Sequence, residues 1–322
     1  MKKLDNRSMR VAISALSLLM ASGFAQAAMV TQWGYSNNAV FSAPSWSGDD
    51  GIAGTTSTIS ASELAWGWSA GSIQSPSADS SLNRSALTVG NFATGALTGG
   101  GPAVGSVQTN TDLTLTGTEI GKGISFTHWN NVLNGNYETL RGATITDTLT
   151  LTPELPGIGP SQAGPTLVFN FQFRETPNAG TNGLCADGKS AVGDYGYNAA
   201  GGGCPDLFGF IGTQTVNQSF IYDGFQYFAS VLSLHADGTL DAIGIAALTS
   251  GECSALNLDG DPLAAGNQCF GFRTLETANT TERFGLAISA IRLPTEIPEP
   301  GAIALIGIAL ACLGLLRLRS RN

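Results

Sequence analysis

The sequence predicts a mainly β protein. We expect an antiparallel β-sandwich or jelly-roll-like ectodomain with a loop-rich N-terminal third, a signal helix before it and a transmembrane helix after it. Three observations predict this fold class. Charged residues make up 12% of the 322 residues, about half the usual share, and glycine occupies 42 positions. Long stretches alternate apolar with polar residues and are rich in β-branched and aromatic side chains. Each end of the chain carries an apolar segment next to basic residues.

Residues 1–27 have the three parts of a secretory signal peptide. Four basic residues are followed by an apolar stretch at 11–24 and then by Ala25-Gln26-Ala27, whose small residues suit signal peptidase. A buried core helix is the alternative, but it does not account for the order of these parts. We therefore predict export through the Sec translocon and cleavage by signal peptidase between Ala27 and Ala28.

Strand patterns dominate the exported domain, residues 28–295. Period-two alternation predicts strands within 111–121, 123–132, 143–155, 165–176, 219–234, 239–248, 269–276 and 281–293. Asp237-Gly238 is typical of a hairpin turn. Residues 34–110 are rich in Ser, Gly, Ala and Thr, and their pattern does not decide between an irregular region and several short strands. No linker marks 30–110 as a separate domain, so we predict one sandwich of about ten or more strands.

The exported domain is strongly acidic. It holds 8 basic and 21 acidic residues, which gives a net charge near −13. A surface of this sign repels phosphate backbones and can attract cations weakly. We expect no nucleic-acid partner.

Four cysteines lie in the exported domain and a fifth, Cys312, lies in the apolar tail. The four are Cys185, Cys204, Cys253 and Cys269. An even number in an oxidising compartment predicts two disulfides, for which three pairings exist. The sequence-local pairing closes two Gly-rich loops, and each bridge would contribute about 3 kcal/mol. A four-cysteine metal site is the alternative, but the sequence has no C-x₂-C pair.

Residues 296–322 combine a short motif, an apolar run and a basic end. The parts are Pro298, Glu299 and Pro300, an uncharged run at 301–316, and the basic residues Arg317, Arg319 and Arg321. A helix of that run would be about 24 Å long, and its basic flank would stay in the cytoplasm. This order resembles the PEP-CTERM sorting signal of Gram-negative bacteria.

The resemblance implies processing by an exosortase-type enzyme after transient anchoring in the inner membrane. It also implies delivery to the cell surface or the extracellular matrix, with exopolysaccharide as a partner. A plain tail anchor is the alternative. The sequence leaves open whether the tail is cleaved or retained.

A second resemblance covers most of the exported domain. Thr127, His128 and Asn130, within Thr127-His128-Trp129-Asn130, are similar to the T-H-x-N signature of the THxN family of PEP-CTERM proteins. Other matching landmarks are Trp33-Gly34-Tyr35, Leu64-Ala65-Trp66-Gly67, Leu151-Thr152-Pro153, and Cys269-Phe270-Gly271-Phe272 with Glu276. The resemblance implies an address at the cell surface and no particular reaction.

Catalytic motifs are absent from the sequence, so we predict no catalytic and no cofactor-binding residue. His128 falls in phase with apolar Ile124 and Phe126 and is expected to be a hydrogen-bonded core residue, whereas His235 is expected to face solvent. The sequence has no G-x-S-x-G elbow and no H-E-x-x-H site. Residues 183–190 match the phosphate-binding pattern GxxxxGK[ST], but no strand precedes them and no helix follows.

Metal ligands are predicted only weakly. Asp259 and Asp261 lie on a Gly-containing turn that would suit Ca²⁺, but they do not complete a calcium-loop motif. A plain solvated turn is the favoured interpretation, and we predict no cofactor other than this calcium.

These observations favour a non-enzymatic surface or matrix protein that is structural or adhesive in an exopolysaccharide context. One alternative is a carbohydrate- or calcium-binding module in which tryptophans stack on sugars, although buried packing is expected for most of them. The other alternative is a secreted hydrolase with paired carboxylates, for which the sequence shows no convincing constellation.

Overall fold

The computed structural model describes residues 28–47, 55–68, 84–112, 114–131, 133, 138–195, 203–210, 217–241, 245–258, 269–276 and 279–293. The chain divides into two compact units. The larger one spans 28–220 and 227–290, and of the smaller one only 221–226 and 291–293 are described. Within the smaller unit the Arg292 guanidinium lies over the Phe225 ring, 6.0 Å from its centroid. The predicted signal peptide and sorting segment lie outside the described residues.

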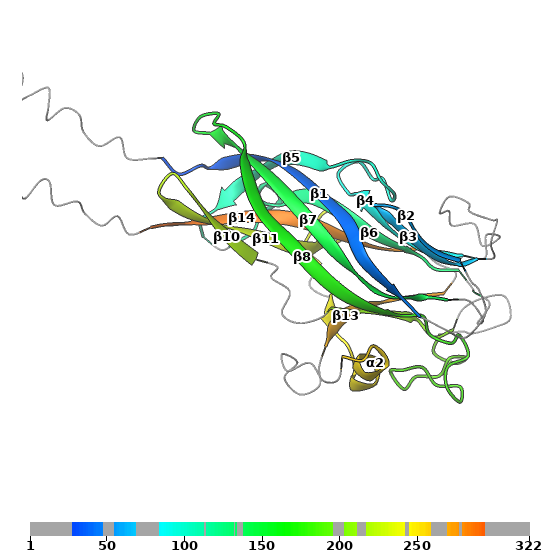
Figure 1. Ribbon diagram of the computed structural model, residues 1–322. Coiled ribbons are helices and arrows are strands. Elements are labelled where there is room, and N and C mark those ends of the chain that lie inside the picture. Colours follow the sequence, from blue (N-terminus) through cyan, green and yellow to red (C-terminus); the bar gives the residue numbers. More distant parts are fainter. Residues whose placement is uncertain are drawn as a thin grey trace, which may run out of the picture. The chain divides into compact units, whose positions relative to one another are not determined.

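The described residues form fourteen strands, one short α-helix and one 3-10 turn (Figure 1). The elements in chain order are β1 (Gln32–Trp46), β2 (Thr55–Ser60), β3 (Glu63–Trp68), β4 (Ser85–Asn91), β5 (Ala103–Asn110), η2 (Gly117–Glu119), β6 (Gly121–Trp129), β7 (Leu140–Leu155), β8 (Gln162–Arg174), β9 (Asp206–Phe210), β10 (Asn217–Tyr222), β11 (Phe225–Leu234), β12 (Ala246–Ala247), α2 (Ser250–Ala255), β13 (Phe270–Thr274) and β14 (Asn279–Arg292). The predicted mainly β class is therefore confirmed.

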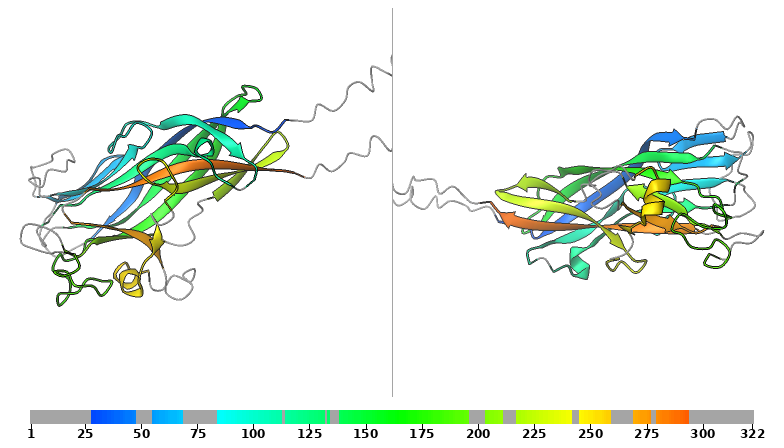
Figure 2. Two further views of the ribbon diagram at one scale, coloured as in Figure 1. Left: turned by 180° about the vertical axis from the view of Figure 1, so that it is seen from behind. Right: turned by 90° about the horizontal axis from the view of Figure 1, so that it is seen from below.

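The strands follow the order β12-β13-β9-β8-β7-β1-β5-β14-β6-β4-β3-β2, and β10 and β11 pair with one another off this path. Neighbours along the order are antiparallel except β5 and β14, where Ile288 and Ser289 align in parallel with Thr109 and Asn110. The order thus divides at this short parallel pairing into two sheets, seen from two further directions in Figure 2. The expectation of a wholly antiparallel arrangement is wrong at this one place.

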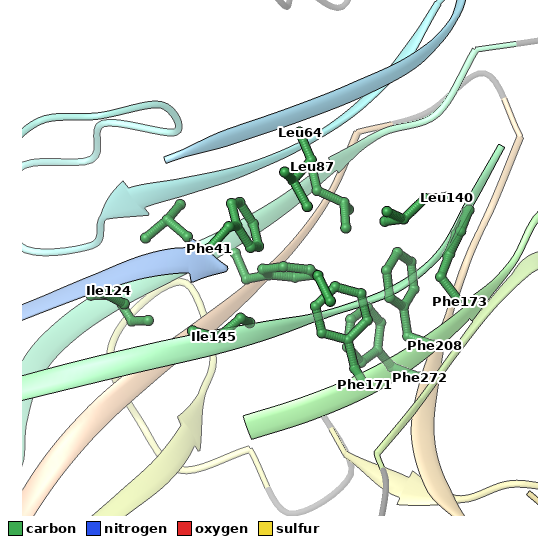
Figure 3. Close-up of a cluster of buried hydrophobic side chains, with 14 of the residues drawn as sticks. Phe41, Leu64, Leu87, Ile124, Leu140, Ile145, Phe171, Phe173, Phe208 and Phe272 are labelled. Carbon is green, nitrogen blue, oxygen red and sulfur yellow. The ribbon is translucent and has the colours of Figure 1, made fainter. Parts of the chain in front are cut away.

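An apolar core joins the two sheets. Phe41 on β1, Ile145 on β7 and Phe171 on β8 pack in the same cluster as Val89 on β4 and Phe126 on β6. Side chains from both sheets therefore interdigitate, as in a sandwich. Figure 3 shows the phenylalanines of this cluster gathered between the strands. Phe171 and Phe173, within the strand predicted at 165–176, are part of this interior, and Phe169 packs against it.

The N-terminal third is richer in strands than predicted. It contains β1 to β5, and β1 is a central strand that pairs with both β5 and β7. Its inward face alternates as a strand should, but that face includes the buried polar residue Asn37 and the small residue Ala39. These two positions hide the alternation in the sequence. The pattern of β4 is hidden for another reason, because all seven of its residues are buried and neither face is exposed to solvent.

We predicted a strand at 111–121. The described residues of this segment before Gly121 instead form a loop that contains the turn η2, and β6 begins at Gly121. Side chains satisfy the backbone here. Asp112 accepts a hydrogen bond from the Thr114 backbone N–H at 2.9 Å, and the Glu119 carboxylate accepts from both the backbone N–H and the hydroxyl of Thr116 at 2.7 Å. Such local side-chain bonds compete with the ladder of a sheet. The alternation of threonines in this segment was therefore a misleading signal.

Two disulfides, Cys185–Cys204 and Cys253–Cys269, connect the cysteines in the sequence-local pairing. Disulfides of this kind are typical of an oxidising, extracellular-type environment. The first bridge closes the loop that contains residues 185–195. The second fastens α2, whose buried Glu252 caps the helix through Thr249 and pairs with the Arg273 guanidinium at 2.5 Å.

A buried carboxyl on β7 gives a prediction about pH. Asp147 is 3% exposed and accepts a hydrogen bond from the Asn37 amide at 2.5 Å. Burial raises the pKa of Asp147 to about 6, partly opposed by this hydrogen bond. The folded state therefore holds a proton more tightly than the unfolded state, and stability falls as pH rises from about 4 to 6.

Asp147→Asn is expected to remove this loss. Because the amide oxygen can still accept from Asn37, we expect the variant to be more stable than the wild type by about 2 kcal/mol at pH 8, with no gain at pH 4. Denaturant unfolding at the two pH values measures the difference. Asp112→Asn, at an exposed carboxylate, is the matched control. A gain of equal size at both pH values would contradict the titration of Asp147.

Candidate metal centre

Three carboxylates from three neighbouring strands meet at one end of the sheet. Glu175 follows the last residue of β8, Asp206 begins β9, and Glu276 lies just beyond the end of β13. The order β13-β9-β8 makes these strands neighbours, with Arg174 level with Leu207 and Thr274 level with Asp206. One oxygen from each carboxylate lies within 4.8 Å of the others. We call Glu175, Asp206 and Glu276 the acidic cluster.

The period of the strands explains why these side chains face the interior. Alternate residues of a strand share a face, so Glu175 is in phase with the buried Phe173, and Asp206 is in phase with the buried Phe208. In the same way Glu276 is in phase with the buried Phe272. Each carboxylate thus continues the inward-facing row of its strand.

The acidic cluster is buried and only partly hydrogen-bonded. Asp206 is fully buried and Glu276 is 4% exposed, while Glu175 is half-buried as a residue. The Asp206 Oδ1 accepts from the Thr176 backbone N–H at 2.7 Å, and the Glu175 Oε2 accepts from the Trp66 indole N–H at 2.9 Å. The Asp206 Oδ2 is buried without a hydrogen bond in the described part of the chain, and the two buried Glu276 oxygens have only the amides of Asn130 and Asn178 beside them.

Desolvation dominates the electrostatics of the acidic cluster. Desolvation of the Glu175 carboxyl, together with repulsion by Glu276, raises its pKa to about 8 although part of the residue reaches the surface. Burial raises the pKa of Glu276 to about 7, opposed by the amides of Asn130 and Asn178 beside it. Burial and the other two carboxylates raise the pKa of Asp206 well above its usual range. No lysine or arginine acts on any of the three among the residues described, so only hydrogen-bond donors such as the Trp66 indole and the Thr176 N–H oppose the desolvation.

The T-H-x-N segment on β6 lies against this centre. The Thr127 hydroxyl bonds that of Thr281 at 3.0 Å, and the His128 Nδ1 lies 2.8 Å from the Thr274 hydroxyl. The Asn130 amide N–H donates to the Leu275 carbonyl at 3.3 Å, and its side chain lies beside the Glu276 carboxyl. The Asn130 Oδ1 is buried without a hydrogen-bond partner in the described structure.

His128 is the core residue that its phase predicts. It is fully buried and stacks on Trp66, with ring centroids 5.6 Å apart. Burial lowers its pKa to about 3, so its imidazole is neutral at physiological pH. Trp129 faces the other way and is also buried, because Leu97 and two alanines cover that side of β6. Both faces of this strand are therefore inside the protein.

The structure also describes His235, the Asp237-Gly238 turn and the loop at 183–190, which the sequence analysis singled out. His235 is exposed, as expected, and its Nδ1 lies 3.5 Å from an Asp241 carboxylate oxygen. The Asp237-Gly238 turn is present, with the Gly238 N–H bonded to the His235 carbonyl at 2.9 Å. The loop at 183–190 is made of turns held by Cys185, and the Lys189 amine is solvated beside Asp187, 3.6 Å away.

Several predicted positions lie outside the described residues. These are the calcium candidates Asp259 and Asp261, the residue Ala27 at the cleavage site, the motif Pro298-Glu299-Pro300, and Arg317, Arg319 and Arg321. Ala28 is exposed. Within the described part of the chain, no helix is both long and apolar enough to span a membrane.

The family resemblance includes Glu276 of the acidic cluster and its neighbours Trp66 and Asn130. It does not include Glu175 or Asp206, which sequence reasoning missed. A usable signal existed, because each carboxylate falls in phase with a buried phenylalanine of its strand: Glu175 and Asp206 are one step from Phe173 and Phe208, and Glu276 is two steps from Phe272. Only the order of the strands shows that the three rows end at the same place.

No protein-family model matches this chain. A search of curated proteins likewise finds no match.

Proposed function

We propose that this protein is an exported, non-enzymatic component of the cell surface or extracellular matrix, delivered by a PEP-CTERM-type tail of the THxN family and structural or adhesive among exopolysaccharides. The observation that carries the proposal is the pair of disulfides in a chain whose two ends resemble an export signal and a sorting signal. Disulfide-stapled β domains are suited to an oxidising exterior.

The buried position of the carboxylates supports a non-enzymatic role. A hydrolase needs its acid and base within reach of the substrate, but two of the three clustered carboxylates are at most 4% exposed. The second candidate function, sugar binding by stacked tryptophans, has little support from the side chains described. Trp33 and Trp66 are fully buried, Trp129 is 8% exposed, and Trp46 packs against the core.

The intact mass of the native protein, recovered from the cell surface and the medium, tests the proposal. We expect a species that begins at Ala28 and ends near Pro298 to Pro300, with any excess mass showing a glycan or an anchor. A mass that runs to Asn322 would refute processing and would leave a protein tethered to the inner membrane.

Affinity electrophoresis in gels that contain exopolysaccharide, with and without Ca²⁺, tests the adhesive role. Retardation in the gel is expected for a matrix component that adheres to polysaccharide. Unchanged mobility in every polysaccharide tested would leave a structural role and argue against adhesion.

A further inference from the structure

We propose that Glu175, Asp206 and Glu276 form a binding site for one Ca²⁺ ion inside the sandwich, with Asn130 supplying a neutral oxygen. This inference does not depend on the sorting signal or on an adhesive role. It concerns residues other than Asp259 and Asp261, the positions that the sequence suggested.

The geometry of the acidic cluster fits a single ion. Three oxygens no more than 4.8 Å apart share a centre at most about 2.8 Å from each of them. Calcium–oxygen distances are about 2.3–2.6 Å, so a small inward movement of these side chains completes the contacts. Three carboxylates offer up to six oxygens, which matches the six to eight that Ca²⁺ takes.

The unsatisfied atoms point to a ligand rather than to a simple acidic patch. The Asp206 Oδ2 and the Asn130 Oδ1 are buried and lack hydrogen-bond partners in the described structure, and the two buried Glu276 oxygens have only the amides of Asn130 and Asn178 beside them. Asn130 is 2% exposed, carries no charge, and lies beside Glu276, so its oxygen is an observation independent of the acidic cluster. Buried polar atoms without partners are rare in proteins because each one costs free energy. A cation among the three carboxylates would compensate their oxygens, and the Asn130 side chain beside Glu276 could add its own.

The chemistry of the donors selects the type of ion. Every donor is an oxygen. The His128 Nδ1 is engaged by the Thr274 hydroxyl, and its Nε2, although buried without a hydrogen-bond partner in the described structure, is not among the ligand atoms that lie within 4.8 Å of one another. Oxygen-only sites suit Ca²⁺, Mg²⁺ and Mn²⁺ rather than Zn²⁺ or copper. Mg²⁺ requires nearly ideal octahedral geometry and keeps several of its waters, which a site this enclosed does not favour. Ca²⁺ accepts irregular carboxylate sets and is therefore the expected ion.

The test measures unfolding of the full chain, kept soluble in mild detergent, in EGTA and in Ca²⁺. The variants are Glu276→Gln and Asp206→Asn, which keep the shape of each side chain and remove one charge. Without Ca²⁺ these variants should be at least as stable as the wild type, because repulsion within the cluster is reduced. With Ca²⁺ the wild type should become the most stable, so the ranking reverses. At a Ca²⁺ concentration 100 times Kd, the folding equilibrium constant of the wild type should rise about 100-fold.

Several results would overturn the proposal. If the ranking is the same in EGTA and in Ca²⁺, the carboxylates share protons and bind no metal. If Ca²⁺ stabilises Glu276→Gln as much as the wild type and Asp259→Asn/Asp261→Asn removes the effect, the ion binds at the loop instead. Asp112→Asn is the control, because it also removes one negative charge but at an exposed position outside the acidic cluster. This variant should keep the full response to Ca²⁺.

A spectroscopic measurement tests the site without relying on stability. Tb³⁺ replaces Ca²⁺ at oxygen sites and emits when a nearby tryptophan is excited. Trp66 touches the acidic cluster through its 2.9 Å bond to Glu175, so tryptophan-excited Tb³⁺ emission should appear at one ion per chain and be displaced by Ca²⁺. Trp66→Phe should abolish most of this emission while direct measurement still finds one Ca²⁺ bound. Emission that survives in Glu276→Gln would place the ion elsewhere.

Discussion

Phe208→Ala is expected to lower the free energy of unfolding by about 3–5 kcal/mol. Phe208 is 1% exposed and stands at the centre of the aromatic core in Figure 3. Its ring lies 4.6 Å from that of Phe173 and 4.7 Å from that of Phe272, centroid to centroid. Removing the ring deletes these contacts and leaves a cavity that the two rigid sheets cannot close. Denaturant unfolding at pH 7 measures the loss.

Phe270→Ala is the matched control, because Phe270 is on neighbouring β13 but is 56% exposed. We expect a change within about 0.5 kcal/mol for this variant. Phe208→Leu, which keeps most of the buried volume, should fall between the two. If Phe208→Ala and Phe270→Ala lose equal stability, the packing of the two sheets described here is incorrect.

Removal of the Cys185–Cys204 bridge in Cys185→Ser/Cys204→Ser is expected to lower the free energy of unfolding by about 3 kcal/mol. The bridge spans 19 residues and restricts the unfolded chain by closing that loop. It also fixes the strand start that carries Asp206, because the Thr176 hydroxyl donates to the Cys204 carbonyl at 3.0 Å. Thermal unfolding of the variant and of the wild type, with and without a reducing agent, checks the expectation.

The matched comparison is Cys253→Ser/Cys269→Ser, whose bridge spans 16 residues and should contribute a similar amount. Reduction of the wild type should then cost more than the loss of either bridge alone. A reducing agent that leaves the unfolding of the wild type unchanged would show that the cysteines are not oxidised in the mature protein. That result would also weaken the inference of an extracellular-type environment.

The sequence predicted the strands whose two faces differ in polarity. The segments at 123–132, 143–155 and 165–176 became β6, β7 and β8, since their apolar residues recur at every second position. The sequence left β1 undecided, because the buried polar residue Asn37 and the small residue Ala39 interrupt the apolar row on its inward face. The prediction was wrong at 111–121, where local side-chain bonds close a turn that alternation alone describes as a strand.

The candidate metal centre was likewise only partly predictable from the sequence. A carboxylate in phase with a buried phenylalanine is visible in the sequence at Glu175, Asp206 and Glu276. What cannot be read there is that three such rows end together, because Glu276 is 101 residues beyond Glu175 in the printed numbering. Asn130 comes from the other sheet, and only the packing of the two sheets brings it beside Glu276.

Sequence alone determined the features that depend on composition and on neighbours along the chain. These are the β class, the acidic charge, the cysteine count, the burial of His128 and the likeness of both ends to export and sorting signals. Tertiary structure decided the features that depend on residues far apart in sequence: the central place of β1, the parallel pairing of β5 with β14, and the meeting of the three carboxylates. The physical reason is that hydrophobic periodicity is a local property, whereas strand order arises from how the sheets bury their faces together.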